Sequence, residues 1–191
     1  MKLPIETYGN QVLRQKCVDV SLNDINLKVL IENMWETMDS ANGCGLAAPQ
    51  VGKAIRLFIV NTKSTYDILQ PDDRKGYFEK GDEGILETFI NAKIIQSSEE
   101  EWEDNEGCLS IPSVSKEVKR PWNITLEYFD SNLKKHTRTF GGYTARVIQH
   151  EYDHTQGILY VDRINPLARK LLEGKLKKIA KGQVPTTYLM K

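Results

Sequence analysis

The chain has little of what marks secreted, membrane-spanning or nucleic-acid-binding proteins. Its three cysteines are an odd number and include no CxxC pair, so they do not indicate a disulfide scaffold. No apolar run approaches the roughly 20 residues of a spanning helix, and the N-terminus resembles neither a signal peptide nor a transit peptide. The 26 basic and 26 acidic residues cancel, which leaves no overall charge to favour nucleic acid or an anionic membrane. We therefore expect a globular, cytosolic protein.

Neither internal repeats nor Gly-, Ser- or Pro-rich linkers divide the 191 residues. Because 40% of the residues are hydrophobic and 27% are charged, the chain can bury a core. We expect a single domain over residues 1–181, followed by a short C-terminal tail over residues 182–191.

Hydrophobic periodicity predicts helices at both ends of the chain and strands between them. Predicted helices cover residues 24–41 (capped by Asn23 or Asp24), 144–156 (ended by Gly157) and 167–181. Predicted strands cover residues 55–61 and about 86–96, 114–120, 122–130 and 133–140. Residues 62–84 are polar with scattered Pro and Gly, which predicts a long surface loop or hairpin. This order favours an α+β fold, with antiparallel strands packed around the helix at 144–156.

Two of the three histidines fall in the segment HEYDH, residues 150–154, within that central helix. Residues four apart stand one turn above each other, so His150 and His154 can bind one metal ion. Glu151 lies on the same side, next to the ion and free to act on its water. The pattern favours a catalytic metal site over a helix that happens to carry two surface histidines.

A catalytic site of this kind needs a third protein ligand. No histidine follows His154, and the only later carboxylates are Asp162 and Glu173. Upstream, Cys108 is preceded by a glycine and offers a thiolate, a strong ligand for borderline divalent metals. Its alternative is a small buried hydrophobic residue, the usual state of an intracellular cysteine. From chemistry alone, both interpretations of Cys108 stay open.

Three segments resemble the motifs of peptide deformylases. Residues 43–50 (GCGLAAPQ) are similar to the family's GxGLAAxQ, residues 106–110 to EGCLS, and residues 149–154 to QHExDH. All three are intact and in the family's order, and the resemblance spans residues 3–180. Single motifs of this kind occur in unrelated proteins, whereas the triple match is specific.

The resemblance implies removal of the N-formyl group from N-formyl-methionyl peptides of newly synthesised proteins in the bacterial cytoplasm, with release of formate. It implies that Cys108, His150 and His154 hold one divalent metal ion, Fe²⁺ physiologically, at a site that Zn²⁺, Ni²⁺ or Co²⁺ can also occupy. Metal-bound hydroxide would then attack the formyl carbon, with Glu151 as general base and later general acid.

The resemblance further assigns the oxyanion donors to the side-chain amide of Gln50 and the backbone N–H of Leu109. It places Gly43 and Gly45 beside the bound peptide, although both can also be plain turn glycines. We expect Cys44 and Val147 near the pocket for the methionine side chain, and an ordinary core position for Cys44 is the alternative that stays open.

Other polar residues give weaker indications. Asp153 either orients a ligand or is a solvated charge, and we expect Arg146 and His136 at the surface. Residues 166–191 contain seven basic residues and one acid, so we expect weak ribosome docking through Lys170, Lys175, Lys177, Lys178 and Lys181. We expect neither a membrane partner nor specific nucleic-acid binding.

Two competing functions remain at this point. A generic HExxH metallopeptidase would cut peptide bonds, whereas deformylation leaves the chain uncut. A non-catalytic metal-binding or ribosome-associated module would need a closed site with a fourth protein ligand. Cys44 is the awkward candidate for that ligand.

Overall fold

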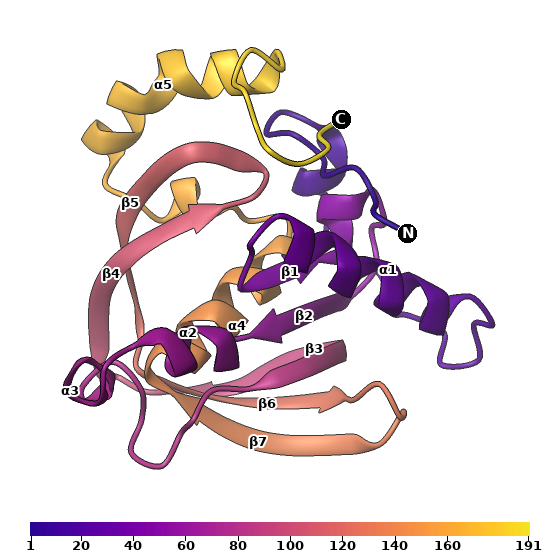
Figure 1. The fold of residues 1–191 in the computed structure, drawn as a ribbon, viewed down its shortest axis with the longest axis vertical. Helices are drawn as coiled ribbons and strands as arrows, with labels where there is room; N and C mark the ends of the chain where they lie inside the picture. Colours follow the sequence, from indigo (N-terminus) through magenta and orange to yellow (C-terminus); the bar gives the residue numbers. More distant parts are fainter.

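The computed structural model describes residues 1–191 and contains two antiparallel sheets with helix α4 (Gly142–Thr155) between them (Figure 1). The larger sheet has the order β1-β2-β3-β6-β7, from strands Gly45–Ala47, Leu57–Asn61, Leu86–Ser97, Asn123–Phe129 and Lys135–Gly141. The smaller is the hairpin of β4 (Glu101–Cys108) and β5 (Ile111–Pro121). The predicted α+β class with antiparallel strands is therefore confirmed.

Helix α4 is buried along almost its whole length. Ala145 and Ile148 pack on the larger sheet in one hydrophobic cluster, together with Phe58 of β2. The opposite side is polar and faces the hairpin, where Gln149 donates a hydrogen bond to the Pro121 carbonyl. The helix ends before Gly157, whose φ is 74° and where an added Cβ would lie 2.6 Å from the Arg14 carbonyl oxygen, so the position has no room for a side chain. Residues 142–155 thus form one buried helix that ends before Gly157.

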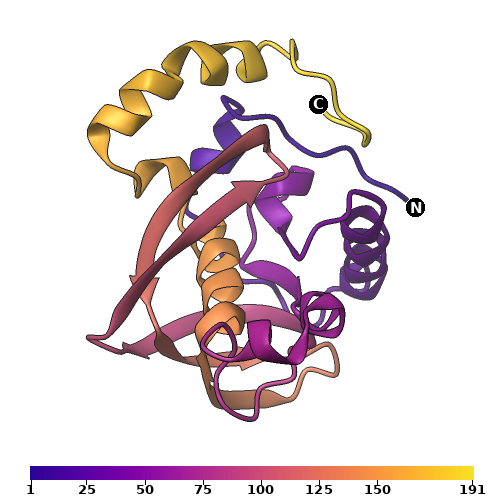
Figure 2. The ribbon, with the colours of Figure 1, turned by 60° about the vertical axis from the view of Figure 1, so that its left-hand side comes forward.

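Two further long helices flank this centre. Helix α1 (Leu27–Ser40) packs through Ile31, Met34 and Met38 on the first two strands. Helix α5 (Pro166–Ala180) packs through Leu176 and Ile179 near the hairpin (Figure 2). Short 3₁₀ helices cover Gln11–Arg14, Ala48–Val51 and Tyr160–Asp162. No helix of the structure combines the length and apolarity needed to cross a bilayer.

Several local predictions are wrong. Helix α1 begins at Leu27, because the Asp24 carboxylate accepts the Asn26 N–H in a preceding turn instead of capping the helix. Residues 62–84 are not a simple loop or hairpin, since they contain helices α2 (Lys63–Ile68) and α3 (Pro71–Arg74). Strands β1 and β4 were not predicted. The first has only three residues, and the second is acidic with a single buried residue, Glu106, so neither shows a clear apolar pattern.

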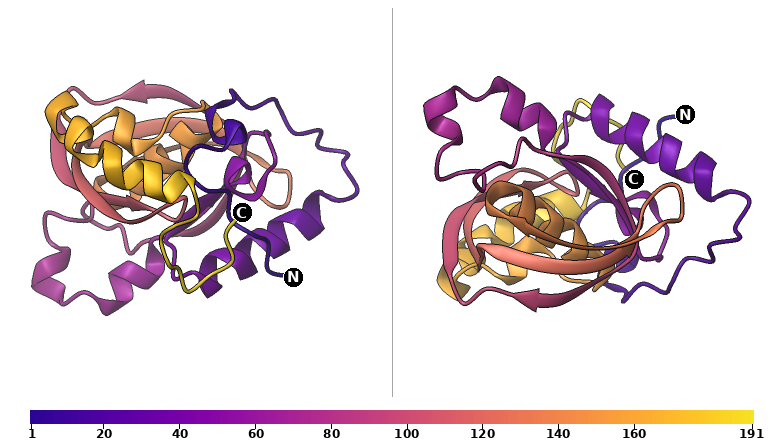
Figure 3. Two further views of the ribbon diagram at one scale, coloured as in Figure 1. Left: turned by 90° about the horizontal axis from the view of Figure 1, so that it is seen from above. Right: turned by 90° about the horizontal axis from the view of Figure 1, so that it is seen from below.

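The two chain ends lie side by side, as Figures 1 and 3 show. Residues 182–191 return from α5 to the N-terminal segment and pair with it in parallel at Ile5 and Met190. The Ile5 N–H donates to the Leu189 carbonyl and the Thr7 N–H to the Lys191 carbonyl, each at 2.9 Å. The tail is thus hydrogen-bonded to the body of the protein.

Candidate metal centre

One face of α4 carries His150, Glu151 and His154, all of them buried. Cys108 is distant in sequence and is the last residue of β4, where the hairpin turns. The ligand atoms of Cys108, His150 and His154 all lie within 4.8 Å of one another, and the Cys108 Sγ is 3.3 Å from His154 Nε2. A thiol sulfur and two imidazole nitrogens form a donor set typical of sites for borderline divalent cations.

His150 is oriented by Glu106 and by Tyr160. Its Nδ1 lies 2.9 Å from Glu106 Oε2, and its ring stacks on that of Tyr160. Because Nδ1 is engaged, Nε2 is the nitrogen left for a cation, as in carboxylate–histidine–metal arrangements. Burial alone would lower the pKa of His150, but its contacts with Cys108 and Glu106 outweigh burial and raise the pKa well above its usual value. A cation that binds here therefore displaces a proton.

Two buried polar atoms beside these ligands, Glu151 Oε2 and His154 Nδ1, have no hydrogen-bond partner. Burial, with a contribution from His150, holds the pKa of His154 well below its usual range, so the ring is neutral as a ligand must be. Burial also raises the pKa of Glu151 to about 7. An unpartnered buried polar atom costs roughly 1–3 kcal/mol, so Glu151 Oε2 fits a site whose remaining partner is a cation or a ligand of that cation. His154 turns Nε2 towards Cys108 Sγ, so Nε2 is the nitrogen available to the same cation and Nδ1 is not.

A buried network of charges supports His150 from behind. Arg120 donates to Glu106 through Nε and Nη2, at 2.5 and 2.8 Å, and to Asp153 through Nη1 at 2.8 Å. Arg163 adds two hydrogen bonds to Asp153. Burial alone would raise the pKa of Glu106, but hydrogen bonds from Arg120 and His150 outweigh burial and hold the pKa well below its usual range. Glu106 is thus an anion fixed against the imidazole.

The expected surface position of Arg146 is wrong. Its side chain is only 2% exposed, and its guanidinium donates to Glu106 and to the carbonyls of Val118 and Trp102, at 2.8 to 2.9 Å. Asp153 is buried as well, so it is not a solvated charge. His136, the other residue expected at the surface, is partly exposed, and its Nε2 lies within hydrogen-bond distance of Asp130 Oδ2, at 2.7 Å.

Gln50 faces the same centre from the 3₁₀ helix that follows β1. Its Oε1 accepts the Ala47 N–H at 2.8 Å, which turns Nε2 towards Cys108 Sγ at 3.5 Å and Ser110 Oγ at 3.3 Å. The side chain is 1% exposed. Its amide N–H groups are therefore held in place beside the candidate ligands.

One cavity of about 850 Å³ brings the candidate residues together. Of the residues expected as metal ligands, catalytic groups or substrate contacts, all except the buried His154 line it: Gly43, Cys44, Gly45, Gln50, Cys108, Leu109, Val147, His150 and Glu151. Cys44, Tyr143 and Val147 pack on one cluster at its wall. Tyr77, from the segment mistaken for a loop, stacks on Tyr143 with ring centroids 4.7 Å apart and so supports that wall.

Sequence reasoning missed the network of Glu106, Arg120, Arg146 and Arg163 and the cavity-lining Tyr188. Glu106 is the first residue of the motif at 106–110, and a negative charge two positions before the candidate ligand Cys108 was the signal that could have pointed to this network. The three arginines and Tyr188 carried no such signal in the sequence, because they come from separate parts of the chain. Arg120 is on β5, Arg146 on α4, Arg163 directly after the 3₁₀ helix Tyr160–Asp162, and Tyr188 in the C-terminal tail.

Comparisons with known proteins agree with the motifs. The family model described as polypeptide deformylase matches residues 2–170. A protein named peptide deformylase from Flavobacterium psychrophilum is 47% identical over 100% of this chain and 97% of its own length. Another protein of that name, from Christiangramia forsetii, is 44% identical over 100% of this chain and 96% of its own length.

Solved structures are similar throughout the chain. The crystal structure of peptide deformylase from Ehrlichia chaffeensis has a TM-score of 0.81 and 30% identity, over 95% of this chain and 98% of its own. The crystal structure of peptide deformylase from Thermus thermophilus has a TM-score of 0.79 and 34% identity, over 95% of this chain and 99% of its own.

Proposed function

The chain belongs to the polypeptide deformylase family, hydrolases that remove the N-formyl group from nascent peptides, and we propose that its centre at Cys108, His150 and His154 performs this reaction with a divalent metal ion. One observation carries the proposal. The ligand atoms of Cys108, His150 and His154 converge at a cavity that Cys108 and His150 line, together with Glu151, whose Oε2 has no hydrogen-bond partner, and Gln50.

Cys108 Sγ and one nitrogen each from His150 and His154 would hold the cation, which we propose to be Fe²⁺, with Zn²⁺, Ni²⁺ or Co²⁺ able to replace it. When bound, such a cation lowers the pKa of a water towards neutrality and polarises a carbonyl oxygen. Glu106 contributes by fixing the His150 ring and its tautomer through the 2.9 Å contact to Nδ1.

Glu151 acts as general base and then as general acid. Burial brings its pKa to about 7, so the carboxyl accepts a proton from the attacking water and returns it to the leaving amine. A group with a pKa near the working pH suits both steps. Such catalysis typically contributes about 10²- to 10⁴-fold in rate.

Gln50 and Leu109 stabilise the developing oxyanion. The Ala47 N–H donates to Gln50 Oε1, which fixes the orientation of the side-chain amide and so of its donor atom, Nε2. Leu109 follows Cys108 directly and lines the same cavity, and its backbone N–H is the second donor. Donors that are already oriented cost no reorganisation during the reaction.

The substrate is a formyl-methionyl peptide that lies along residues 43–45. Gly45 presents its backbone to the peptide, beside Gly43, and Cys44 and Val147 border the pocket of the methionine side chain, where Tyr143 completes an apolar wall. We assign this activity to one catalytic domain, residues 1–181, in the bacterial cytoplasm.

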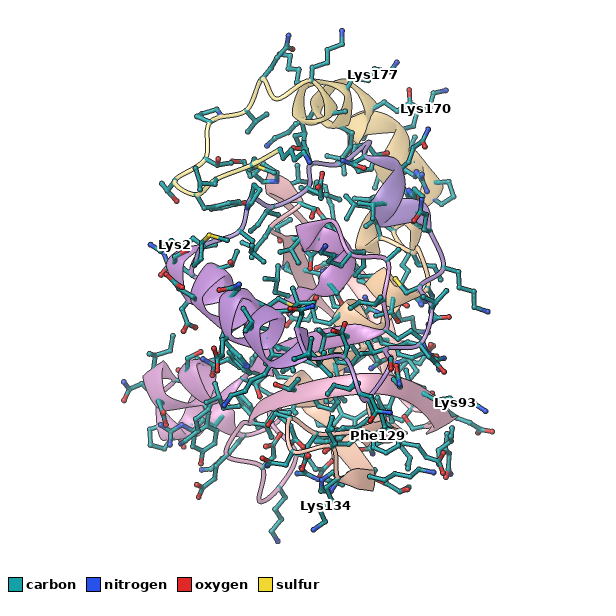
Figure 4. All side chains as sticks on the ribbon, turned by 90° about the vertical axis from the view of Figure 1, so that its right-hand side faces the viewer. Lys2, Lys93, Phe129, Lys134, Lys170 and Lys177 are labelled. Atoms are coloured by element: carbon teal, nitrogen blue, oxygen red, sulfur yellow. The ribbon has the colours of Figure 1, made fainter.

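The basic residues of α5 are the proposed ribosome contact. Lys170 and Lys177 extend from one end of the molecule in Figure 4. Lys175, by contrast, donates to the Ser113 carbonyl and is already engaged. Replacing the exposed Lys170, Lys177, Lys178 and Lys181 with Gln is expected to reduce co-sedimentation with ribosomes at low salt, and unchanged co-sedimentation would remove this contact.

The experiment is a formate-release assay on formyl-Met-Ala with protein purified anaerobically and analysed for metal. We expect one formate per peptide and an intact Met-Ala bond, whereas a peptidase would release alanine. Glu151→Gln is expected to keep the metal and lose at least about 100-fold in turnover. Full turnover by that variant would contradict the assigned base.

A further inference from the structure

The C-terminal tail reaches the cavity of the candidate metal centre. Its last residues are anchored on the N-terminal segment by the hydrogen bonds of Leu189 and Lys191. At its other end Val184 packs on the cluster that includes α5. The segment Pro185–Tyr188 between these anchors lines the 850 Å³ cavity together with the candidate ligands.

The same segment also borders a second cavity of about 360 Å³. Thr186, Thr187 and Tyr188 line both spaces, and Leu3 and Thr37 form part of the far side of the smaller one. Residues 186–188 therefore form a wall that separates the two cavities: the larger one, with the candidate centre, lies on one side of this segment and the smaller one on the other.

Tyr188 ties this wall to the hairpin turn that carries Cys108. Its hydroxyl donates to the Leu109 carbonyl at 2.8 Å, and the next carbonyl, of Ser110, accepts the Tyr8 N–H at 2.9 Å. Burial raises the pKa of Tyr188 to about 12, so the phenol keeps its proton near neutral pH. Both chain ends thus hold the turn beside the candidate ligands.

The cavity is larger than a formyl-methionyl group requires. Its 850 Å³ lies near the upper end of the roughly 300–1,000 Å³ that enclose drug-sized ligands. Its acidic and basic lining side chains, Glu106, Arg146, His150 and Glu151, belong to the centre or to the paired network behind it, whereas the tail contributes Pro, Thr and Tyr. The outer part is therefore uncharged, with hydroxyl and backbone groups suited to an extended peptide.

We propose that Pro185–Tyr188 is a specificity-determining wall of the substrate groove, which contacts the formyl peptide beyond its first two residues. The inference rests on the proposed function and deepens it. Tyr188 is a positioning residue in this account, since it fixes the wall on Leu109. The groove favours uncharged side chains in the downstream part of the peptide.

The test compares formyl-Met-Ala with formyl-Met-Ala-Ser-Ala in two variants, Tyr188→Phe and a chain that ends at Val184. The first removes one hydroxyl, and the second removes the wall. Tyr128→Phe is the matched control, because it removes a buried hydroxyl that donates to Glu87 on the larger sheet, away from the cavity. Melting temperatures check that each variant folds.

The loss of one net hydrogen bond is expected to raise KM for the longer peptide about fivefold in Tyr188→Phe, with a smaller change for the dipeptide. Truncation is expected to reduce the preference for the longer peptide, as a ratio of kcat/KM values, roughly tenfold. Tyr128→Phe is expected to keep the ratio. An unchanged ratio in both tail variants, or equal losses on both peptides, would overturn the inference.

A second measurement separates this outcome from failure of the proposed function. Calorimetry with the unformylated peptide Met-Ala-Ser-Ala needs no turnover, and its Kd is expected to rise in both tail variants. If the unaltered protein releases no formate, the proposed reaction is wrong and these Kd values alone decide the role of the wall. Equal Kd values would then reject it.

Discussion

Replacing Glu106 with Gln tests the buried charge network that supports the candidate metal centre. The carboxylate is 5% exposed and accepts hydrogen bonds from Arg120, Arg146 and His150. Glutamine preserves the shape of the side chain but removes its negative charge. Asp153 is then the only carboxylate that pairs with Arg120, and Arg146 keeps only its hydrogen bonds to backbone carbonyls. Because breaking a buried ion pair from one side costs about 3–5 kcal/mol, we expect a loss of about 3 kcal/mol in the free energy of unfolding.

The assay is urea denaturation of the metal-free protein, with unchanged m as the check that only stability differs. Glu101→Gln is the matched control, since Glu101 lies on the same strand but pairs with Lys119 at the exposed surface, where an ion pair contributes about 0–1 kcal/mol. We also expect Glu106→Gln to lower metal affinity about 10- to 100-fold, measured by competition with a chelator. Equal stability of the two variants would refute the reasoning.

Three further predictions concern the centre itself. Gly45→Ala places a Cβ within 2.7 Å of the Glu151 Cγ and is expected to abolish most formate release. Gly174→Ala is the control: its Cβ meets no atom within 4 Å, and the substitution is expected to raise the free energy of unfolding by up to about 1 kcal/mol in thermal denaturation. Gln50→Ala is expected to lower kcat about 10²- to 10³-fold with metal content unchanged, and normal kcat would exclude it as an oxyanion donor. Cys108→Ala is expected to yield protein with little bound metal after dialysis, and full metal content would contradict its place among the ligands.

Local patterns predicted the centre of the fold well. The HEYDH segment and Gly157 define α4 because helical spacing and a left-handed C-terminal glycine are properties of a few neighbouring residues. The α+β class followed from the order of such segments.

The interior charges could not be predicted in this way. Arg146 reads as a surface cation because its partner Glu106 lies 40 positions away and meets it only when β4 packs on α4. Strand β4 itself is acidic and its one buried residue is the charged Glu106, so periodicity gives no apolar face to recognise. The position of Tyr188 likewise depends on pairing between the two chain ends, which no local pattern encodes.

X-ray absorption spectroscopy of the zinc-loaded protein tests the convergence of Cys108, His150 and His154 on one ion. We predict one sulfur at about 2.3 Å and two imidazole nitrogens at about 2.0–2.1 Å, with the sulfur contribution absent in Cys108→Ala. A shell of nitrogen and oxygen alone in the unaltered protein would contradict the account.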